Sequence, residues 1–400
     1  MLAAVCLLVA VAGCGGSGTP STPGPGGETA SPDSSAGSPP AATGPQGATP
    51  LAGGLPRVRA IAAGYDHSLV LLENGDVYSF GSNNSGQLGL GDNQDRLTPT
   101  KIEGLSGVKT IAAYCYHSLA LLENGDVLSF GLNEQGELGL GDLENRNVPT
   151  RVPGLSNVKY IFAGVSASAA VTESGEGYFF GRAGAHYALS GLSPNLVNGL
   201  PPIRAFAPGR EAVVILLEDG GIYVFGSGGS LGLGHGEYVT APTRLGSAAG
   251  VRTVAAGSMQ SLLLLDNRDV YSFGLGYQGQ LGLGEATSEA PVPTKIPGLP
   301  PAAAIAAGYN HCLILTPDGE VYSFGEGVTG QLGLAEQVDR FVPTKIEGLS
   351  GVTAIAGGIQ FSLVLLADGE VYSFGQNYSG QLGHGDYVAR PTPTRIEAFK

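Results

Sequence analysis

The sequence has no tryptophan, few charged residues and even fewer basic ones. Charged residues make up 14 % of the 400 residues, against about 25 % in an ordinary soluble domain. Lys and Arg number 20 against 34 Asp and Glu, which gives a net charge of −14. A protein that binds nucleic acid nonspecifically needs cations to displace counterions from the phosphates. The charge balance therefore excludes that class, and we expect no nucleic-acid partner.

Helical periodicity is missing as well. Beyond residues 1–14, no long stretch repeats its apolar side chains every 3.6 positions, so the sequence predicts no amphipathic helix. Glycine and proline are instead abundant, at 66 and 26 residues. That share approaches low complexity unless the glycines recur at a fixed period. Because 42 % of the residues are apolar, the chain has ample material for a large core.

Residues 1–14 form an apolar segment that predicts export. The segment is too short to span a bilayer, which needs about 20 residues, and it is typical of the apolar part of a secretory signal. It lacks the usual basic start, which leaves a start further upstream open. Val11-Ala12-Gly13-Cys14 resembles the lipobox of bacterial lipoproteins. That resemblance implies lipidation of Cys14, with simple cleavage of the signal as the alternative.

Residues 15–54 predict a disordered tether. Nineteen of these 40 residues are Gly or Pro, most of the others are Ser, Thr or Ala, and only Glu28 and Asp33 are charged. Such a chain cannot bury enough apolar surface to offset the entropy lost on ordering. The tether would display a folded region, residues 55–400, on the extracellular face of the cell membrane, or the protein would be secreted.

Residues 55–400 contain one unit repeated seven times. Each unit holds apolar runs such as 58–64, 68–72 and 77–81, and most units end with a Pro-Thr step such as Pro99-Thr100. Asn-Gly or Asp-Gly pairs between the second and third runs are typical of type I′ hairpin turns. A Phe-Gly step recurs about every 49 residues, at Phe80, Phe130, Phe180, Phe225, Phe273, Phe324 and Phe374.

Four short strands per unit cannot bury both faces of their sheet alone, so the sheets must pack on one another in a radial array. The sequence therefore predicts an all-β fold, a seven-bladed β-propeller of four-stranded antiparallel blades. No Pro-Thr strand precedes Val58. We accordingly expect the C-terminal segment 394–399 to pair with the first strand, 58–62, and to latch the ring.

The repeat resembles the regulator of chromosome condensation repeat family. The first unit reads Gly64-Tyr65-Asp66-His67-Ser68, and its second half, residues 75–89, reads GDVYSFGSNNSGQLG. The resemblance extends over residues 55–400. It implies a seven-bladed propeller and, from the founding activity of the family, guanine-nucleotide exchange on a nuclear GTPase with chromatin binding.

Three functions known in this family fit the sequence unequally. Exchange in the founding member depends on an inserted wedge, and the nearly uniform repeat spacing here shows no comparable insertion. A plant ultraviolet-B photoreceptor of the family senses light through clustered tryptophans, which the absence of tryptophan excludes. The secreted beta-lactamase inhibitory protein II matches the expected location. Its repeats, however, are shorter and carry Trp-Gly in place of Phe-Gly.

Candidate catalytic and metal-binding residues are few. His67, His117 and His311 share a repeat position that other units fill with Ala167, Glu211, Gln260 and Phe361. This pattern favours structural histidines, bonded within their own blades, over a ring of ligands. No His or Cys spacing is typical of zinc. The G-x-G-x-x-G segments 274–279 and 325–330 precede strands, whereas a dinucleotide site needs a helix there.

We therefore predict no catalytic residues, no cofactor and no metal, although a triad assembled only in space stays open. Cys115 and Cys312 fall in the second and sixth units, so we expect both to be buried and not joined to each other. Arginines three residues before the Pro-Thr step are expected to bond within their own blades. These arginines are Arg96, Arg146, Arg340 and Arg390.

The third and fourth units depart most from the repeat, and departures of this kind often mark a specialised surface. Their exceptional residues Arg182, His186, Tyr187 and Arg210 form the predicted partner surface, because Tyr and Arg are favoured interface anchors. Drift of the sequence in a tolerant blade is the alternative. We expect a monomeric, non-catalytic scaffold that binds an unidentified protein and touches the membrane only through its lipid. The alternatives are a GTPase exchange factor and a secreted enzyme inhibitor.

Overall fold

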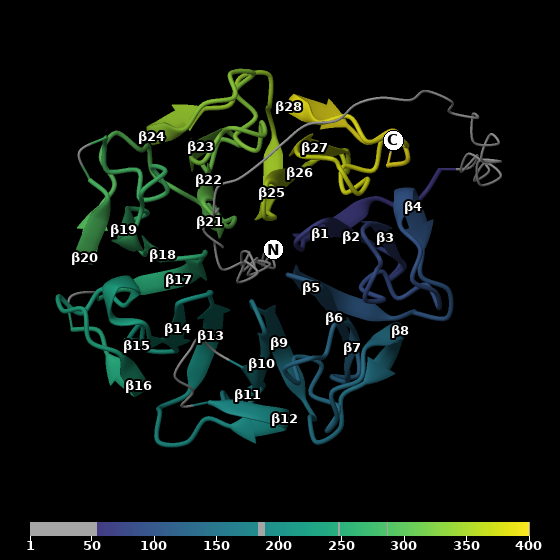
Figure 1. Cartoon of the computed structure of the whole chain (residues 1–400), viewed down its shortest axis with the longest axis horizontal. Helices are drawn as coiled ribbons and strands as arrows, with labels where there is room; N and C mark the ends of the chain where they lie inside the picture. Colours follow the sequence, from purple (N-terminus) through teal and green to yellow (C-terminus); the bar gives the residue numbers. More distant parts are fainter. Residues whose placement is uncertain (1–53, 183–188, 247–248, 286, 400) are drawn as a thin grey trace, which may run out of the picture.

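The computed structural model describes residues 54–399 except 183–188, 247–248 and 286. These residues form seven four-stranded antiparallel sheets arranged as blades around a central axis (Figure 1). A single turn of 3-10 helix, Gly228–Ser230, is the one helical element in the described part. The predicted all-β, seven-bladed propeller is confirmed. The predicted signal, residues 1–14, lies outside the described residues, as does nearly all of the predicted tether.

Each blade uses four consecutive strands, with the first nearest the axis and the fourth at the rim (Figure 1). Blade 1 holds β1 (Val58–Ala63), β2 (His67–Leu72), β3 (Val77–Gly81) and β4 (Arg96–Lys101). Blade 2 holds β5 (Val108–Tyr114), β6 (His117–Leu122), β7 (Val127–Gly131) and β8 (Arg146–Arg151). Blade 3 holds β9 (Val158–Ala163), β10 (Ala167–Thr172), β11 (Gly177–Arg182) and β12 (Ser190–Leu196).

The remaining blades follow the same order. Blade 4 holds β13 (Ile203–Pro208), β14 (Ala212–Leu217), β15 (Ile222–Gly226) and β16 (Val239–Arg244). Blade 5 holds β17 (Val251–Ala256), β18 (Gln260–Leu265), β19 (Val270–Leu275) and β20 (Glu289–Lys295). Blade 6 holds β21 (Ala304–Ala307), β22 (His311–Leu315), β23 (Val321–Gly325) and β24 (Arg340–Lys345). Blade 7 holds β25 (Val352–Gly357), β26 (Phe361–Leu366), β27 (Val371–Gly375) and β28 (Arg390–Arg395).

The strand sequences account for this layering. The second strand of each blade is almost entirely buried, as in β2 and β14, because a neighbouring blade covers each face. The predicted type I′ hairpin turns do not form, because only the glycine of each pair has a positive φ: Gly75 is at +84°, whereas Asn74 is not in the left-handed region. Gly75 N donates to Leu72 O at 3.0 Å and Leu72 N donates to Asp76 O at 2.9 Å, which is the pattern of a three-residue hairpin loop that ends in a left-handed glycine. Outer strands are more exposed, and six of the seven carry the proline of the Pro-Thr step. Proline suits an edge strand because it has no N–H to offer to another chain.

Neighbouring blades interlock through one recurring contact. In blade 1, Gly89 has a φ of +70°, and a Cβ added there would lie 2.9 Å from the Phe130 ring of blade 2. Equivalent glycines pack on the Phe of the next blade at the pairs Gly139–Phe180, Gly232–Phe273, Gly282–Phe324, Gly333–Phe374 and Gly383–Phe80. The Phe-Gly step and the Gln-Leu-Gly step are therefore two halves of one junction, joined across blades.

The prediction that the C-terminal segment pairs with the first strand is wrong. β28 pairs with β27, and β1 pairs with β2, so the first and last blades each form from their own consecutive strands. The ring instead closes as the other junctions do. Gly385 N donates to Leu97 O at 2.9 Å, just as Gly91 N donates to Asn147 O at 2.8 Å between blades 1 and 2. Phe399 and Ile396 complete the apolar core between blades 7 and 1.

Candidate functional site

One face of the ring carries two sets of loops, and we call it the loop face. The loop between the first and second strands of a blade lies against the loop that follows the third strand. Ser82 N donates to Asp66 O at 2.7 Å in blade 1, and Leu132 N donates to Tyr116 O at 2.8 Å in blade 2. The first loops lie around the central axis on this face, since the first strands lie nearest the axis (Figure 1).

The three repeated histidines are structural, as predicted, but their bonds run between blades and not within them. His67 Nε2 lies 2.9 Å from Ser118 Oγ of the next blade, and His117 and His311 repeat the contact with Ser168 and Ser362 at 2.9 Å. All three rings are completely buried, which lowers their pKa to about 3 and keeps them neutral. The fourth blade places Ala212 at this position, so the sequence alignment to Glu211 was one residue off.

The arginines before the Pro-Thr step bond within their own blades, which confirms the prediction. Arg96 Nη2 lies 2.7 Å from Asp92 Oδ2, and Arg146 and Arg390 make the same contact with Asp142 and Asp386. Arg340 pairs with Glu336 in the same way. These contacts close the loops that precede the outer strands. They give the four arginines a structural role within their blades.

The structure does not gather the predicted partner residues at one point. Arg182, exposed at the end of β11, donates from Nη1 to Gln135 Oε1 of blade 2 at 3.1 Å. Arg210 lies in the first loop of blade 4 and donates to the Tyr309 hydroxyl of blade 6 at 2.6 Å. Both belong to the loop face but engage different blades. His186 and Tyr187 lie outside the described residues.

A cluster of tyrosines in the first loops of the loop face escaped the sequence analysis. The rings of Tyr65 and Tyr116 stack with centroids 4.8 Å apart and planes 14° apart. Tyr114 is fully buried, which raises the pKa of its hydroxyl, and the charges of Tyr309 and Arg210 also act on it. At the repeat position of Tyr114, other blades place glycine, for example Gly64 and Gly308. A repeat alignment that compares every blade at each position would have exposed this substitution.

A row of exposed apolar residues on the loop face also escaped the sequence analysis. Tyr277, Val328 and Tyr378 occupy one repeat position in the third-strand loops of blades 5, 6 and 7, and are 64, 53 and 72 % exposed. Further along the same loops of blades 6 and 7, Val338, Tyr387 and Val388 are exposed as well. Blades 1 and 2 fill the row position with Asn84 and Glu134. At this repeat position the loop face is therefore apolar on blades 5–7 and polar on blades 1 and 2.

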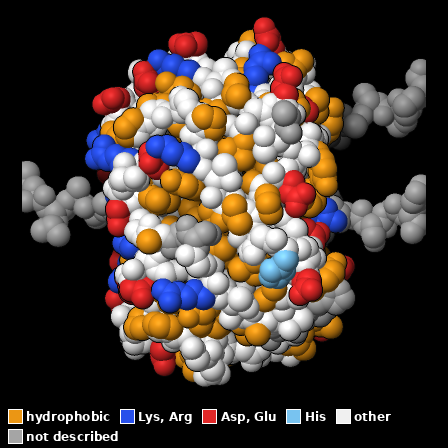
Figure 2. Space-filling model, turned by 90° about the vertical axis from the view of Figure 1, so that its left-hand side faces the viewer, with side chains coloured by type: hydrophobic (Ala, Val, Ile, Leu, Met, Phe, Trp, Pro, Cys, Tyr) orange, Lys and Arg blue, Asp and Glu red, His pale blue; other side chains and the backbone are white. Residues whose placement is uncertain are grey.

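The outer rim also exposes hydrophobic side chains. Figure 2 shows the side that carries β20, where hydrophobic side chains cover much of the middle and many charged ones lie towards its edges. Val292 of β20 and Val342 of β24 are 44 and 50 % exposed. Such scattered side chains on proline-containing outer strands are common on protein surfaces. Val292 and Val342 also share a repeat position, on blades 5 and 6, whereas the row on the loop face extends over a third blade and is more exposed.

Carboxyl groups at the loop face are withdrawn from solvent to different degrees: Glu137 is buried and Asp66 is partly buried. Burial raises the pKa of Asp66 to about 7, with a further contribution from Asp95, and the Asp66 carboxylate accepts from Gln381 Nε2 at 3.0 Å. Burial likewise raises the pKa of Glu137 to about 7. Glu137 Oε2 accepts the backbone N–H of Gln135 at 2.7 Å. Both acids lie at junctions between blades.

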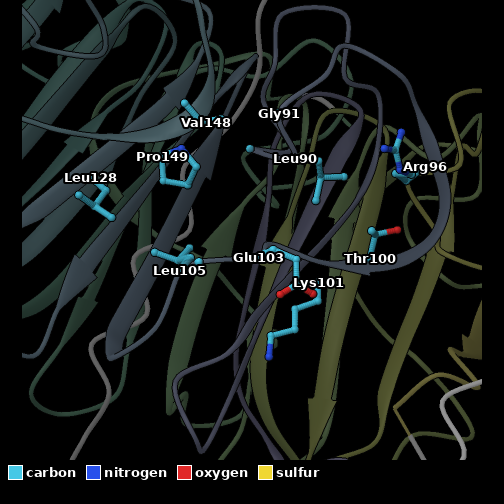
Figure 3. Close-up of a pocket in the computed structure, with 12 residues that line it drawn as sticks. Leu90, Gly91, Arg96, Thr100, Lys101, Glu103, Leu105, Leu128, Val148 and Pro149 are labelled. Carbon is cyan, nitrogen blue, oxygen red and sulfur yellow. The ribbon is translucent and has the colours of Figure 1, made fainter.

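A groove opens at the rim between blades 1 and 2, with a cavity volume of about 430 Å³. Figure 3 shows Leu128, Val148 and Pro149 of blade 2 on one side and Leu90, Arg96 and Thr100 of blade 1 on the other. Leu105 lies on the connection between the two blades and also lines the groove. Its floor is apolar, and its cations Arg96 and Lys101 are each paired with an aspartate.

In the described part of the chain, no three His, Cys, Asp or Glu residues lie close enough to hold a metal ion. The G-x-G-x-x-G segments are repeat turns as predicted: Gly279 N donates to Gly276 O at 3.1 Å, and a strand follows. Cys115 and Cys312 are both buried, and Cys312 is a free thiol, so the two are not joined to each other. Over the described residues, no helix is long and apolar enough to cross a membrane.

Seven consecutive four-stranded blades, joined by Gly–Phe contacts, define a β-propeller that is built from sequence repeats of one blade each. The chain belongs to the family of the regulator of chromosome condensation (RCC1) repeat. Two models of this repeat together match more than half of the chain, at residues 74–121, 124–171, 269–315, 318–365 and 368–400, and at residues 58–87, 108–137, 302–331 and 352–381. The unmatched segment 172–268 includes Arg182 and Arg210.

Relatives with curated descriptions match over about one repeat. The E3 ubiquitin-protein ligase MYCBP2 of Danio rerio is 49 % identical over 49 residues, which cover 12 % of this chain and 1 % of that protein. The ultraviolet-B receptor UVR8 of Arabidopsis thaliana is 49 % identical over 47 residues, covering 12 % and 11 %. The chain thus spans only a small part of the relatives it matches.

Solved structures match over most of the ring. Yeast RCC1 (Prp20), solved with Kap60, is 25 % identical with a TM-score of 0.75 and covers 82 % of this chain and 85 % of its own. Prp20p from Saccharomyces cerevisiae is 28 % identical with a TM-score of 0.69, covering 77 % and 82 %. Human WBSCR16, at 24 % identity and a TM-score of 0.70, covers 78 % and 87 % and shares the fold.

Proposed function

We propose that this chain is a non-catalytic propeller that binds a protein partner through its loop face. The observation that carries the proposal is the row of Tyr277, Val328 and Tyr378, exposed at one repeat position on three consecutive blades. A fold of this kind accepts any side chain at a solvent-exposed loop tip, so large apolar residues there add nothing to its stability. Contiguous exposed apolar groups on a soluble protein are typical of interaction surfaces.

The composition of the row supports a protein partner. Tyrosine brings a large apolar area with few rotatable bonds and is enriched among interface residues that dominate binding energy. Arg182 and Arg210 of the same face remain part of the proposed partner surface, together with His186 and Tyr187. The partner would therefore meet an apolar region on blades 5–7 and arginines on blades 3 and 4.

The test is capture of binding proteins from cell-surface and secreted fractions by the full chain. A triple variant, Tyr277→Ser, Val328→Thr and Tyr378→Ser, should lose a captured partner while retaining the thermal unfolding curve of the wild type. The matched control changes the same repeat position on the polar side, Asn84→Ala with Glu134→Ala, and should keep that partner. Equal capture by all three proteins would refute the proposed face.

We also propose that Cys14 is lipidated and that the chain is displayed on the extracellular face of a bacterial cell membrane. The support is the sequence of residues 1–14 and the low charge of the spacer that follows. Expression in a bacterial host with a radiolabelled fatty acid should label the wild type in the membrane fraction. Cys14→Ser should abolish the label and release the protein. A wild type that carries no label would argue for cleavage without lipidation.

A second candidate function is guanine-nucleotide exchange. The observation that favours it is the likeness to yeast RCC1 (Prp20), whose solved structures cover most of this ring at 25 and 28 % identity. Stimulated release of a fluorescent guanine nucleotide from a GTPase of the same organism would support this function. If every GTPase tested releases its nucleotide at its intrinsic rate in the presence of this protein, exchange activity is refuted and the binding function stands.

A further inference from the structure

At the groove between blades 1 and 2, one repeat position of the lining departs from the other six blades. The second residue of the third strand is tyrosine in every other blade: Tyr78, Tyr178, Tyr223, Tyr271, Tyr322 and Tyr372. In blade 2 it is Leu128. Strand pairing confirms the equivalence, since Leu128 lies opposite Arg151 just as Tyr78 lies opposite Lys101. Leu128 is thus the single aliphatic residue in a set of tyrosines.

The tyrosine rings fill the equivalent junctions elsewhere. Five of the six lie close to the residue that corresponds to Leu105 on the connection between blades. Between blades 7 and 1, the ring of Tyr78 meets that of Phe399 edge-on, with centroids 5.9 Å apart. Other junctions bring together the pairs Tyr178–Leu155, Tyr223–Leu200, Tyr322–Leu299 and Tyr372–Leu349 in their apolar clusters. At the junction of blades 1 and 2, the pair is Leu128 and Leu105.

Replacing a phenol ring by the shorter leucine side chain leaves the junction of blades 1 and 2 open to solvent. The opening is the groove of about 430 Å³ lined by Leu90, Leu105, Leu128, Val148 and Pro149 (Figure 3). Its walls are the same apolar groups that cover a tyrosine ring at the sibling junctions. The groove therefore has the shape and lining of a site from which an aromatic ring is missing.

We propose that this groove binds one aromatic side chain, tyrosine or phenylalanine, presented by a protein partner. We infer an aromatic occupant because the six other blades each place a tyrosine of this same chain at the equivalent position. The polar groups at the rim suit a ring that arrives on a peptide. Arg96 and Lys101 are held in place by Asp92 and Asp76 and bring cations beside an aromatic ring, while exposed Glu103 and Thr100 can meet the peptide backbone.

The inference rests on the proposed function only in taking the ring to come from a protein. The groove lies on blades 1 and 2, and none of its residues belongs to the apolar row of blades 5–7. A partner whose capture depends on the row and not on the groove would separate the two ideas. The opposite outcome would also separate them: the groove would bind an aromatic side chain, while the row of Tyr277, Val328 and Tyr378 would capture no partner.

The experiment uses the full chain with labelled Leu and Val methyl groups, titrated with N-acetyltyrosinamide and followed by NMR. The methyl signals of Leu90, Leu128 and Val148 should shift in a saturable way. N-acetylleucinamide should bind at least tenfold more weakly, because its side chain cannot fill the ring-shaped space. Equal binding of the two amides would overturn the aromatic assignment. p-Cresol that binds at least tenfold more tightly than N-acetyltyrosinamide would show a site for free small aromatics and overturn a peptide-borne ring.

Two variants make the test specific. Leu128→Tyr restores the sibling residue, so it should raise the melting temperature while reducing affinity for N-acetyltyrosinamide at least tenfold. Tyr178→Leu should create a second groove at the junction of blades 2 and 3, and with it a second binding event of similar affinity. Unchanged affinity in Leu128→Tyr would overturn the proposal, and the first variant decides the question even if Tyr178→Leu fails to fold.

Discussion

Glu137 shows how a single charged residue is accommodated at a blade junction. Four other blades place glutamine at this position: Gln87, Gln280, Gln331 and Gln381. In each of them the side-chain oxygen accepts a backbone N–H two residues earlier, as Glu137 Oε2 does from Gln135. The hydrogen bond is thus the same, and the difference is an ionisable group that is 1 % exposed. A buried carboxylate without a cationic partner costs free energy when it ionises.

Glu137→Gln should therefore stabilise the protein in a pH-dependent way. The folded state holds the Glu137 proton more tightly than the unfolded chain, because burial raises the pKa from 4.5 to about 7. The destabilisation from ionisation accordingly grows as pH rises from about 4.5 to about 7 and is complete above that range. We expect Glu137→Gln to gain about 3 kcal/mol in the free energy of unfolding at pH 8.5 and little at pH 4.5.

Urea unfolding of the variant and the wild type at both pH values measures this difference. Asp66 also titrates near pH 7, but it is present in both proteins and its contribution cancels. A gain of equal size at the two pH values would mean that packing, and not ionisation, separates the two side chains.

At the scale of elements, the loops after the third strands serve two purposes. Their inner parts join the blades, since six of them place a left-handed glycine on the phenylalanine ring of the next blade. Their tips project to solvent and carry the apolar row of blades 5–7. The joining part tolerates almost no change, because a side chain there must adopt positive φ and displace a buried ring. The tips are free to vary, which explains why the row differs from blade to blade.

Gly89→Ala should lower the free energy of unfolding by more than backbone strain alone would. The change forces an L-residue to a φ of +70° and puts a methyl group 2.9 Å from the Phe130 ring, for a loss of about 2–4 kcal/mol. Gly104→Ala is the matched control, because Gly104 has a φ of +77° with no atom within 4 Å of the added Cβ. The control should lose only about 1 kcal/mol. Chemical denaturation of both variants checks the difference, and equal losses would show that the contact with Phe130 is unimportant.

At the scale of the whole molecule, the ring is closed by side chains and loops and not by a shared sheet. Every blade is complete in itself, and the junction between blades 7 and 1 uses the same hydrogen bonds and apolar contacts as the others. Ser68 Oγ donates to Gln381 O at 2.8 Å across this junction. Phe399, near the C-terminus, packs against Tyr78 of the first blade.

Phe399→Ala should open this junction. Removing a ring that is 3 % exposed leaves a cavity, and we expect a loss of about 3–5 kcal/mol. Phe399→Leu introduces the residue that the junctions at Leu105, Leu155 and Leu349 use, and it should lose less than about 1.5 kcal/mol. Circular dichroism during urea unfolding should show one transition for each variant. Two separate transitions in Phe399→Ala would mean that blade 7 unfolds apart from the rest of the ring.

The sequence by itself determined the blade count, the four-strand pattern and the structural nature of the repeated histidines, because a repeat displays the same local chemistry seven times. It also singled out Arg182 and Arg210 as departures. It misjudged contacts that cross from one blade to the next: the direction of the histidine bonds and the means of ring closure. Such contacts join residues about one repeat apart, or residues at opposite ends of the chain, and spacing does not reveal them.

Only the tertiary structure decided which departures from the repeat create a surface. Leu128 looks conservative within its own strand, yet it opens a groove because the ring that it lacks would have packed on a neighbouring blade. Tyr277, Val328 and Tyr378 become one row only when their blades stand side by side. The physical reason is common to both cases. Local sequence specifies how each blade folds, whereas cavities and patches depend on what the adjacent blade places against it.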